Sequence, residues 1–321
     1  MTMHDTAAEG RARRSLVAGG AGFIGSHLTE ALVKRGDEVT VVDDLSTGSL
    51  DNLSGVIGSV EFVEADIGSF EAGGRFDKVY HLACTANAAD YTARPLDVLR
   101  SSSSGTANLL GIASESGADF CYFSSSEVYG DQPQGGSGTA ESSTASFRPL
   151  TARSVYQVSK SFAEELVARS CEASGIWYAI LRPFNIYGTR MDVRSPYGRV
   201  MTNFARSLSR GEPLTVNGDG LQTRSFCHVD DAVRAVLLLD SLPGYPCAPL
   251  NVGNPEQVTI EGLARLMAEA CGAEARIVHA DPVPDEPRHR MPDVSLARSL
   301  LGWSPEIPLR EGIRDVLREA E

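Results

Sequence analysis

The sequence has little of several features that mark specialised classes of protein. No apolar run approaches the ~18 residues of a membrane-spanning helix, so we expect no membrane span. Basic residues number 29 against 42 acidic ones, and the formal net charge of −13 argues against a nucleic-acid-binding surface. With 42% apolar and 22% charged residues, the composition excludes disorder, collagen and coiled coil, and it is typical of a globular protein.

Cysteine is also sparse and scattered. The six cysteines form neither a CxxC pair nor a Cys/His cluster with zinc spacing, so no structural metal is expected. Thiols in apolar stretches behave as small hydrophobic groups, which favours a reducing, cytoplasmic location. Residues 1–14 are polar and charged and lack the apolar segment of a signal peptide, and we interpret them as a disordered leader.

Apolar segments of strand length alternate with helical patterns over residues 15–183. Helices are expected from residue 23 to Gly36, over 108–116 and over 156–172, and the expected strands are 15–18, 39–42, 60–63, 78–83, 120–124 and 177–181. Such alternation predicts an α/β fold in which crossover helices cover a doubly wound, Rossmann-type parallel sheet.

Beyond residue 183 the pattern becomes irregular, because proline and glycine are frequent. Helices are expected only over residues 230–239 and 260–271, and the four prolines within residues 281–292 exclude a regular element there. The sequence therefore predicts a first domain over residues 15–183. Residues 184–321 are expected to form mainly a smaller second domain, with some segments that return to the first.

A glycine-rich turn joins the first expected strand to the first expected helix. Gly19 would make the tight turn, Gly22 would let the backbone approach a pyrophosphate, and Gly25 would pack the helix against the strand. The diphosphate would bind at the positive end of the helix dipole. Three glycines alone are weak evidence, but the order strand, glycines, helix, strand and terminal Asp43 favours a dinucleotide. Asp43 would bind a ribose 2′-hydroxyl and repel a 2′-phosphate, so NAD rather than NADP is expected.

Tyr156 and Lys160 lie one helical turn apart on the same helix face. A nearby cation lowers the pKa of a phenol, and the phenolate could take a proton from a substrate hydroxyl while hydride leaves the same carbon. The alternative is an accidental surface pair. Ser125 and Glu127 follow an apolar strand, at the end where open α/β sheets bind ligands, and the alternative is an ordinary serine-rich turn without function.

The GxxGxxG spacing and the YxxxK pair together resemble the extended short-chain dehydrogenase/reductase superfamily, and within it the NAD-dependent epimerase/dehydratase family of nucleotide-sugar enzymes. The resemblance is strongest over residues 15–240. The pair Ser126-Glu127 resembles that of UDP-glucuronate decarboxylases, whereas 4,6-dehydratases carry Asp-Glu there and 4-epimerases lack the carboxylate. The runs 182–188, 218–226 and 288–293 follow the decarboxylase pattern as well.

This resemblance implies roles for individual residues. The implied catalytic residues are Ser125, Glu127, Tyr156, Lys160 and Arg290. The implied substrate-binding residues are Tyr91, Arg100, Asn185, Arg199, Arg224 and Arg290, and for Arg100 a solvated surface charge is an equal alternative. The implied cofactor-binding residues are Gly19, Gly22, Phe23, Ile24, Gly25, Asp43, Asp44, Ser46, Thr47, Gly48, Asp66, Ile67, Leu82, Tyr156 and Lys160.

The reaction implied by the resemblance is the NAD-dependent decarboxylation of UDP-glucuronate. Oxidation at C4 would give a β-keto acid, which would lose CO2 before re-reduction to UDP-xylose, or UDP-4-keto-xylose would be released instead. The first domain would then hold NAD and the second the nucleotide-sugar. A UDP-hexose 4-epimerase, a nucleotide-sugar 4,6-dehydratase and a catalytically silent NAD-sensing protein remain alternatives. The resemblance also implies a homodimer formed by helices within 96–116 and 156–172.

Overall fold

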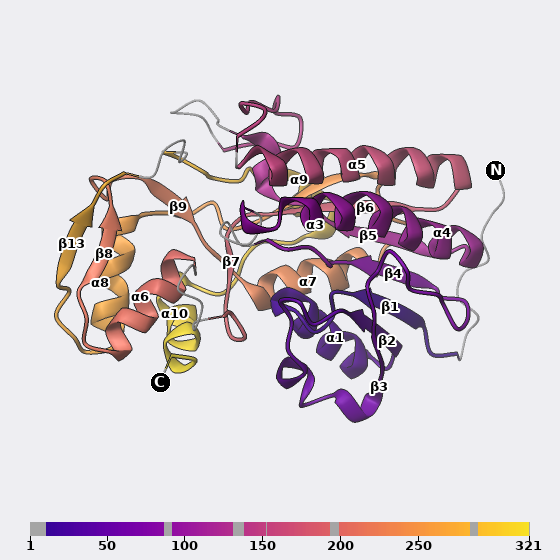
Figure 1. Cartoon of the computed structure of the whole chain (residues 1–321), viewed down its shortest axis with the longest axis horizontal. Helices are drawn as coiled ribbons and strands as arrows, with labels where there is room; N and C mark the ends of the chain where they lie inside the picture. Colours follow the sequence, from indigo (N-terminus) through magenta and orange to yellow (C-terminus); the bar gives the residue numbers. More distant parts are fainter. Residues whose placement is uncertain are drawn as a thin grey trace.

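Seven parallel strands form the central sheet of the protein (Figure 1). The computed structural model describes residues 11–86, 92–130, 138–151, 153–192, 199–282 and 288–320. The strand order is β11-β6-β5-β4-β1-β2-β3, and it confirms the predicted doubly wound α/β fold. The strands are β1 (Arg14–Ala18), β2 (Glu38–Asp43), β3 (Val60–Glu64), β4 (Lys78–His81), β5 (Asp119–Phe123), β6 (Tyr178–Pro183) and β11 (Ala248–Val252).

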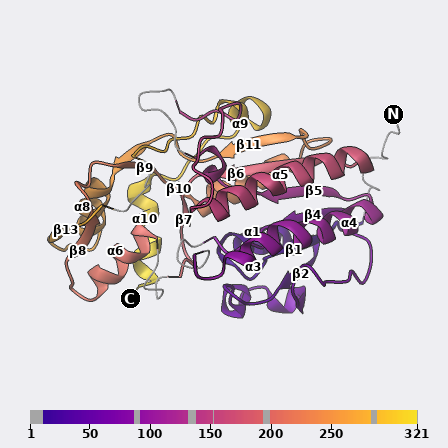
Figure 2. The ribbon, with the colours of Figure 1, turned by 45° about the horizontal axis from the view of Figure 1, so that its top comes forward.

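Helices cover both faces of this sheet because side chains alternate along each strand. Val17 and Val41 pack on the face covered by the helices α1 (Phe23–Arg35), α7 (Val229–Leu239) and α9 (Ser295–Leu301). Leu16 and Val42 pack on the opposite face, which is covered by α3 (Pro95–Arg100), α4 (Thr106–Ser116) and α5 (Ser154–Ser174). Figures 1 and 2 show α3, α4 and α5 side by side on that face.

The predicted elements of the first half are present, with small differences at their ends. Gly36 ends α1 in the left-handed conformation, with a φ of 95°, as its position after the helical pattern predicts. β4 ends at His81, two residues before the predicted end. The small-residue run Ser101–Gly105 forms a π-helical turn between α3 and α4, which the sequence pattern does not reveal.

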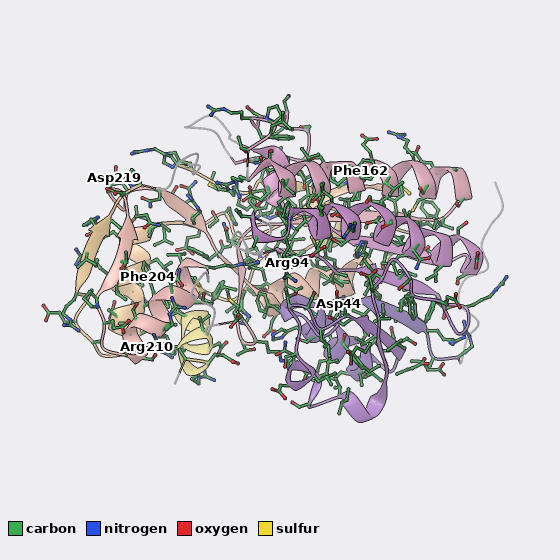
Figure 3. All side chains as sticks on the ribbon, in the orientation of Figure 1. Asp44, Arg94, Phe162, Phe204, Arg210 and Asp219 are labelled. Carbon is green, nitrogen blue, oxygen red and sulfur yellow. The ribbon has the colours of Figure 1, made fainter. Side chains whose placement is uncertain are left out.

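A smaller lobe lies at one end of the sheet (Figure 1). Its core includes Phe204, which is labelled in Figure 3, together with Leu263, Met267 and Val316. Its helix α8 (Ile260–Ala270) matches the predicted segment 260–271, whereas α6 (Val200–Ser209) and α10 (Leu309–Arg318) are not predicted. The lobe contains β8 (Leu214–Asn217), β9 (Thr223–Ser225), β12 (Gln257–Thr259), β13 (Ile277–Ala280), α6 (Val200–Ser209), α8 (Ile260–Ala270) and α10 (Leu309–Arg318).

The second half of the chain also contributes to the sheet. β11 pairs with β6 at the sheet edge, and α7 and α9 pack on the face that holds α1. Between the lobe and the sheet, β7 (Ile186–Tyr187) pairs with β10 (Cys227–His228). Segments from both sides of residue 183 therefore share one core.

The predicted leader, residues 1–14, is described only at its carboxyl end. Residues 1–10 lie outside the described residues, whereas Arg14 already opens β1 and its backbone N–H donates to Asp77. Within the described part of the chain, we find no helix that is both long and apolar enough to span a membrane.

Candidate active site

The glycine-rich turn between β1 and α1 is shaped as the sequence predicts. Gly19 has a φ of 82°, and a Cβ there would lie 2.6 Å from the backbone nitrogen of Ala83. A Cβ on Gly25 would lie 2.0 Å from the carbonyl oxygen of Gly19, so only glycine allows this approach of helix and strand. Gly22 precedes α1, and no side chain among the described residues caps its first turn. The turn therefore fits a diphosphate, which would bind the first amide groups of α1.

Asp43 stands at the carboxyl end of β2, beside this turn. Its carboxylate accepts hydrogen bonds from the backbone of Ala21, at 3.0 Å, and of Leu45, at 2.9 Å. Burial raises the pKa of Asp43, and the two N–H groups oppose that shift. Each carboxylate oxygen keeps lone pairs for a ribose hydroxyl, so the position fits the adenosine ribose of NAD.

The other predicted cofactor residues lie near the same edge of the sheet. A Cβ on Gly48 would lie 3.1 Å from the Asp43 carboxylate, so the loop that holds Asp44, Ser46 and Thr47 folds back against the glycine-rich turn. Figure 3 labels Asp44 in this loop. Phe23 and Ile24 open α1, Leu82 directly follows β4, and Asp66 and Ile67 follow β3. Their cofactor contacts remain predictions.

Tyr156 and Lys160 both lie buried in α5, and their side chains are close together. The Lys160 Nζ is 5.8 Å from the centre of the Tyr156 ring, and it donates a hydrogen bond to the carbonyl oxygen of Phe123 at 2.8 Å. Burial and the nearby thiol of Cys84 raise the pKa of Tyr156. A hydrogen bond with Ser125 and the positive charge of Arg199 act in the opposite direction. The phenol is therefore protonated unless additional positive charge approaches it.

Ser125 also stabilises the turn that follows β5. Its Oγ accepts the backbone N–H of Glu127 at 3.2 Å and so caps the single 3-10 turn Ser126–Tyr129. This turn directs Glu127 towards two arginines from distant parts of the sequence. The Arg153 guanidinium binds both carboxylate oxygens of Glu127, at 2.8 and 3.1 Å, and Arg290 Nη1 lies 2.5 Å from Oε1.

The two guanidinium groups determine the ionisation of Glu127. Burial alone would raise the pKa of its carboxyl group, but the charges and hydrogen bonds of Arg290 and Arg153 lower that pKa to about 2. Two positive charges thus face one negative charge. The Arg290 Nη2 atom is buried and has no hydrogen-bond partner among the described residues. A further acceptor, such as a carboxylate, would match this unpaired donor.

Arg153 is the residue that the sequence reasoning missed. It stands three residues before Tyr156, about one helical turn away, and this spacing is the signal that could have placed it near the catalytic tyrosine. Arg290, which the resemblance implies, is brought to the same point from the segment between β13 and α9.

The remaining predicted substrate residues are less closely gathered. Asn185 has a φ of 40°, and its amide donates to the carbonyl oxygen of Ser225 at 2.8 Å. The Arg199 Nη1 donates to the carbonyl oxygen of Ile186 at 3.1 Å, and burial lowers the pKa of this guanidinium, although the side chain stays accessible to solvent.

Two predicted arginines have contacts outside this cluster. Arg224 donates to the backbone oxygen of Thr223 at 2.8 Å. Arg100 has a side chain that is 72% exposed, and it pairs with Asp97 at 3.5 Å. Tyr91 lies outside the described residues. Substrate contacts of these three residues remain predictions. Within the described ranges, no three His, Cys, Asp or Glu side chains form a group that could hold a metal ion.

The fold, the site and the similarity to known proteins together identify the family to which the chain belongs. The sheet, the glycine-rich turn and the tyrosine–lysine pair define a short-chain dehydrogenase/reductase. Residues 15–243 match the model of the NAD dependent epimerase/dehydratase family. The chain belongs to this family.

Relatives within the family include several decarboxylases. The chain is 40% identical to UDP-glucuronic acid decarboxylase 6 of Arabidopsis thaliana, over 94% of this chain and 86% of the relative. It is 36% identical to UDP-glucuronic acid decarboxylase 1 of Xenopus tropicalis, over 95% of this chain and 71% of the relative.

Solved structures of epimerases share the fold. UDP-glucose 4-epimerase of Thermotoga maritima is 30% identical, with a TM-score of 0.87 over 95% of this chain and 98% of that structure. UDP-glucuronic acid 4-epimerase of Bacillus cereus, in complex with UDP-glucuronic acid and NAD, is 26% identical, with a TM-score of 0.84 over 96% and 98% of the two chains.

Proposed function

We propose that this protein is an NAD-dependent UDP-glucuronate decarboxylase, which converts UDP-glucuronate to UDP-xylose. The observation that carries the proposal is the position of Glu127 between Arg153 and Arg290, close to Tyr156. A 4-epimerase acting on a neutral hexose needs no such group of charges. The decarboxylases named above, at 36–40% identity, support the same activity.

The charge balance at Glu127 favours an anionic sugar. A guanidinium group binds a carboxylate through two parallel hydrogen bonds, and burial strengthens that attraction. Because the buried Nη2 atom of Arg290 has no hydrogen-bond partner in the described part of the chain, a substrate carboxylate could bind it without displacing Glu127 from Nη1. We therefore assign Arg290 to the uronic acid carboxylate, with Arg153 as its neighbour.

The chemistry begins with removal of a proton from the C4 hydroxyl group. Tyr156 acts as the base, hydrogen-bonded to Ser125, and the positive charge of Arg199 and the nearby Lys160 favour its phenolate. The positive charge of the nicotinamide ring of NAD would add to theirs and lower the pKa of Tyr156 further. The glycine-rich turn and Asp43 would hold NAD, which would supply a hydride acceptor for C4 and a hydride donor for the final reduction. Oxidised C4 places a carbonyl group β to the carboxylate, so the C5–CO2 bond can break with its electron pair delocalised onto the C4 oxygen.

The residues around Glu127 then govern the second half of the reaction. Arg290 holds the carboxylate until the C5–CO2 bond breaks, and the negative charge that then develops on the C4 oxygen is stabilised by the hydroxyl groups of Tyr156 and Ser125. Glu127 has a pKa of about 2 and is therefore ionised near neutral pH, so it orients Arg290 rather than supplying a proton itself. The carbon C5 is reprotonated from a water molecule or a protonated neighbour, and C4 is reduced.

The decisive experiment is incubation of the protein and NAD with UDP-glucuronate, followed by mass analysis of the products. Loss of CO2 with formation of UDP-xylose or UDP-4-keto-xylose supports the proposal. Turnover of UDP-glucose together with no reaction of UDP-glucuronate would refute it. Replacement of Arg290 by Ala should slow CO2 release strongly and leave a measurable residual rate, whereas an epimerase of neutral sugars would tolerate this change.

A second candidate is a 4-epimerase, since the solved structures of similar fold include epimerases of UDP-glucose and of UDP-glucuronic acid. An epimerase would return a product of unchanged mass with inverted C4. A silent NAD-binding role is a third interpretation, and it requires that Tyr156→Phe leave every activity of the protein unaltered.

We further propose that the protein is a homodimer formed by α3 and α5. Four large apolar side chains on these neighbouring helices are exposed, Leu96, Leu99, Val158 and Phe162, and Phe162 is 51% exposed. Figure 3 labels Phe162 on α5. Two copies of this face would bury one another across a two-fold axis. Light scattering should give the mass of two chains, and Phe162→Glu should give the mass of one.

A cytoplasmic location is also proposed. It is supported by the free state of all six cysteines, which suits a reducing compartment. Fractionation of cells that produce the protein would test this location directly.

A further inference from the structure

The carboxyl half of the edge strand β11 holds a buried asparagine that the proposed reaction does not use. Asn251 is 0% exposed. Its Oδ1 accepts the hydroxyl group of Tyr129 at 2.7 Å, and its Nδ2 donates to the carbonyl oxygens of Thr139, at 2.8 Å, and Asp293, at 3.0 Å. One side chain therefore joins three segments that are far apart in the sequence.

Two of these segments bind each other beside the asparagine. The backbone N–H of Thr139 donates to the carbonyl oxygen of Met291 at 2.8 Å, and the N–H of Asp293 donates to Thr139 at 3.0 Å. Gly138, with a φ of 105°, permits this contact, because a Cβ there would lie 2.8 Å from the nitrogen of Asp293. Arg290 immediately precedes Met291, so these bonds fix the backbone that presents its guanidinium.

The third segment carries Glu127. Tyr129 ends the 3-10 turn in which Glu127 lies, and Asn251 accepts its hydroxyl group. That hydroxyl also accepts a hydrogen bond from Arg182 Nη1 at 2.9 Å, and Arg182 in turn binds Glu164 of α5. The turn is thereby tied to the same helix that carries the catalytic tyrosine.

These contacts form a closed ring. It runs from Glu127 through its own turn to Tyr129, through Asn251 to Asp293, and back along the chain to Arg290, whose Nη1 binds Glu127. Breaking the ring at the asparagine would leave the strand pairing of β11 intact, because that pairing uses the backbone.

We propose that Asn251 is a positioning residue that fixes Arg290 relative to Glu127. It increases the rate of CO2 loss, and it has little effect on the rate of C4 oxidation, which depends on Tyr156. The inference rests on the proposed decarboxylase function, since it assigns the asparagine to one step of that reaction. The physical reason is geometric: a displacement of about 1 Å at a reacting centre can cost ~100-fold in rate.

The test is the substitution Asn251→Asp, which keeps the volume and the acceptor for Tyr129 but removes both N–H donors. Asn108→Asp is the matched control, because Asn108 Nδ2 also donates to two backbone carbonyl groups, of Ile67 and Phe70, each at 2.8 Å. In a single turnover with UDP-glucuronate, the absorbance of NADH reports C4 oxidation, and trapped CO2 reports decarboxylation.

We expect Asn251→Asp to slow CO2 release ~10- to 100-fold while NADH appears at nearly the wild-type rate. The control variant should leave the ratio of the two rates unchanged. In the Arg290→Ala background, Asn251→Asp should lower CO2 release by no more than about 2-fold further, because both changes disable the same unit. The inference is overturned if oxidation and CO2 release fall together, if neither changes, or if the two substitutions act additively.

The outcome can be separated from failure of the proposed function. If the wild-type protein releases no CO2 from UDP-glucuronate, the proposed function is wrong whatever the variants do. The same two substitutions can then be compared by thermal unfolding without substrate. Non-additive shifts of the melting temperature would support the positioning of Arg290 by Asn251, and additive shifts would refute it.

Discussion

Arg153 binds both carboxylate oxygens of Glu127, with Nη2 2.8 Å from Oε1 and Nε 3.1 Å from Oε2. The arginine lies at the start of the helix that carries Tyr156, and the glutamate lies in the turn that follows β5. The ion pair thus connects the helix of Tyr156, the proposed base, to Glu127, which binds the Arg290 assigned to the substrate carboxylate. Because Arg290 adds a second positive charge, the carboxyl group of Glu127 has a strongly lowered pKa.

The acid stability of the protein should depend on Glu127. Its folded-state pKa of about 2 lies below the ordinary value of 4.5, so its contribution is complete above pH 4.5 and is lost as the pH falls towards 2. We expect Glu127→Gln to lower the free energy of unfolding at pH 7 by about 3 kcal/mol. Urea unfolding between pH 7 and pH 3 should show the two proteins converging; a difference that grows towards low pH would contradict the assignment.

Tyr156→Phe should lower kcat by ~10²- to 10⁴-fold, because it removes the hydroxyl group proposed to take the C4 proton. NAD affinity, followed by the quenching of protein fluorescence, should change little. Tyr178→Phe is a suitable control, since Tyr178 lies in β6 and is not part of the site. Equal activity of wild type and Tyr156→Phe would exclude this tyrosine as the base.

Arg199→Gln should move the pH dependence of kcat/KM. The positive charge of Arg199 lowers the pKa of Tyr156, so its removal raises that pKa. Activity that requires the phenolate will then begin at higher pH than in the wild-type protein. Arg210→Gln serves as the control, because Figure 3 places Arg210 in the small lobe, away from the sheet. An unchanged profile for Arg199→Gln would show that its charge does not reach the phenol.

Gly25→Ala should destabilise the protein by about 3 kcal/mol and abolish NAD binding, because the new Cβ would overlap the carbonyl oxygen of Gly19. Gly111→Ala is the matched control: it lies inside α4, and its Cβ would meet nothing within 4 Å. We expect that substitution to stabilise the protein by about 1 kcal/mol. Calorimetry and NAD titration of both variants would decide; normal NAD binding by Gly25→Ala would contradict the close packing of the turn.

The features that could be predicted from the sequence are those with local causes. Strand and helix periodicity predicts the sheet, and the glycine spacing predicts the turn that Gly19 and Gly25 form. Tyr156 and Lys160 could be paired because one helix carries both. Arg153 precedes Tyr156 by about one helical turn and lies on the same helix face. Its role could not be predicted, because the sequence does not show that Glu127 is its ion-pair partner.

Contacts between distant segments could not be predicted in this way. Thr139 and Asp293 pair through backbone groups, and such pairing has no sequence signature. The hydrogen bond from Asn251 to the carbonyl oxygen of Asp293 depends on this pairing, so it could not be predicted either. The amphipathic repeat of Leu309, Ile313 and Val316 could have revealed α10, but the proline-rich segment before it obscured the pattern.

The place of β11 at the sheet edge has a consequence for synthesis of the protein. β6 leaves the ribosome long before residues 248–252 exist, so a nascent chain that has already assembled the earlier strands presents β6 as an open edge. An apolar, unpaired edge of this kind invites association with other chains. Ribosome-bound fragments that stop before β11 should therefore need chaperone protection, which is relieved once that strand is translated.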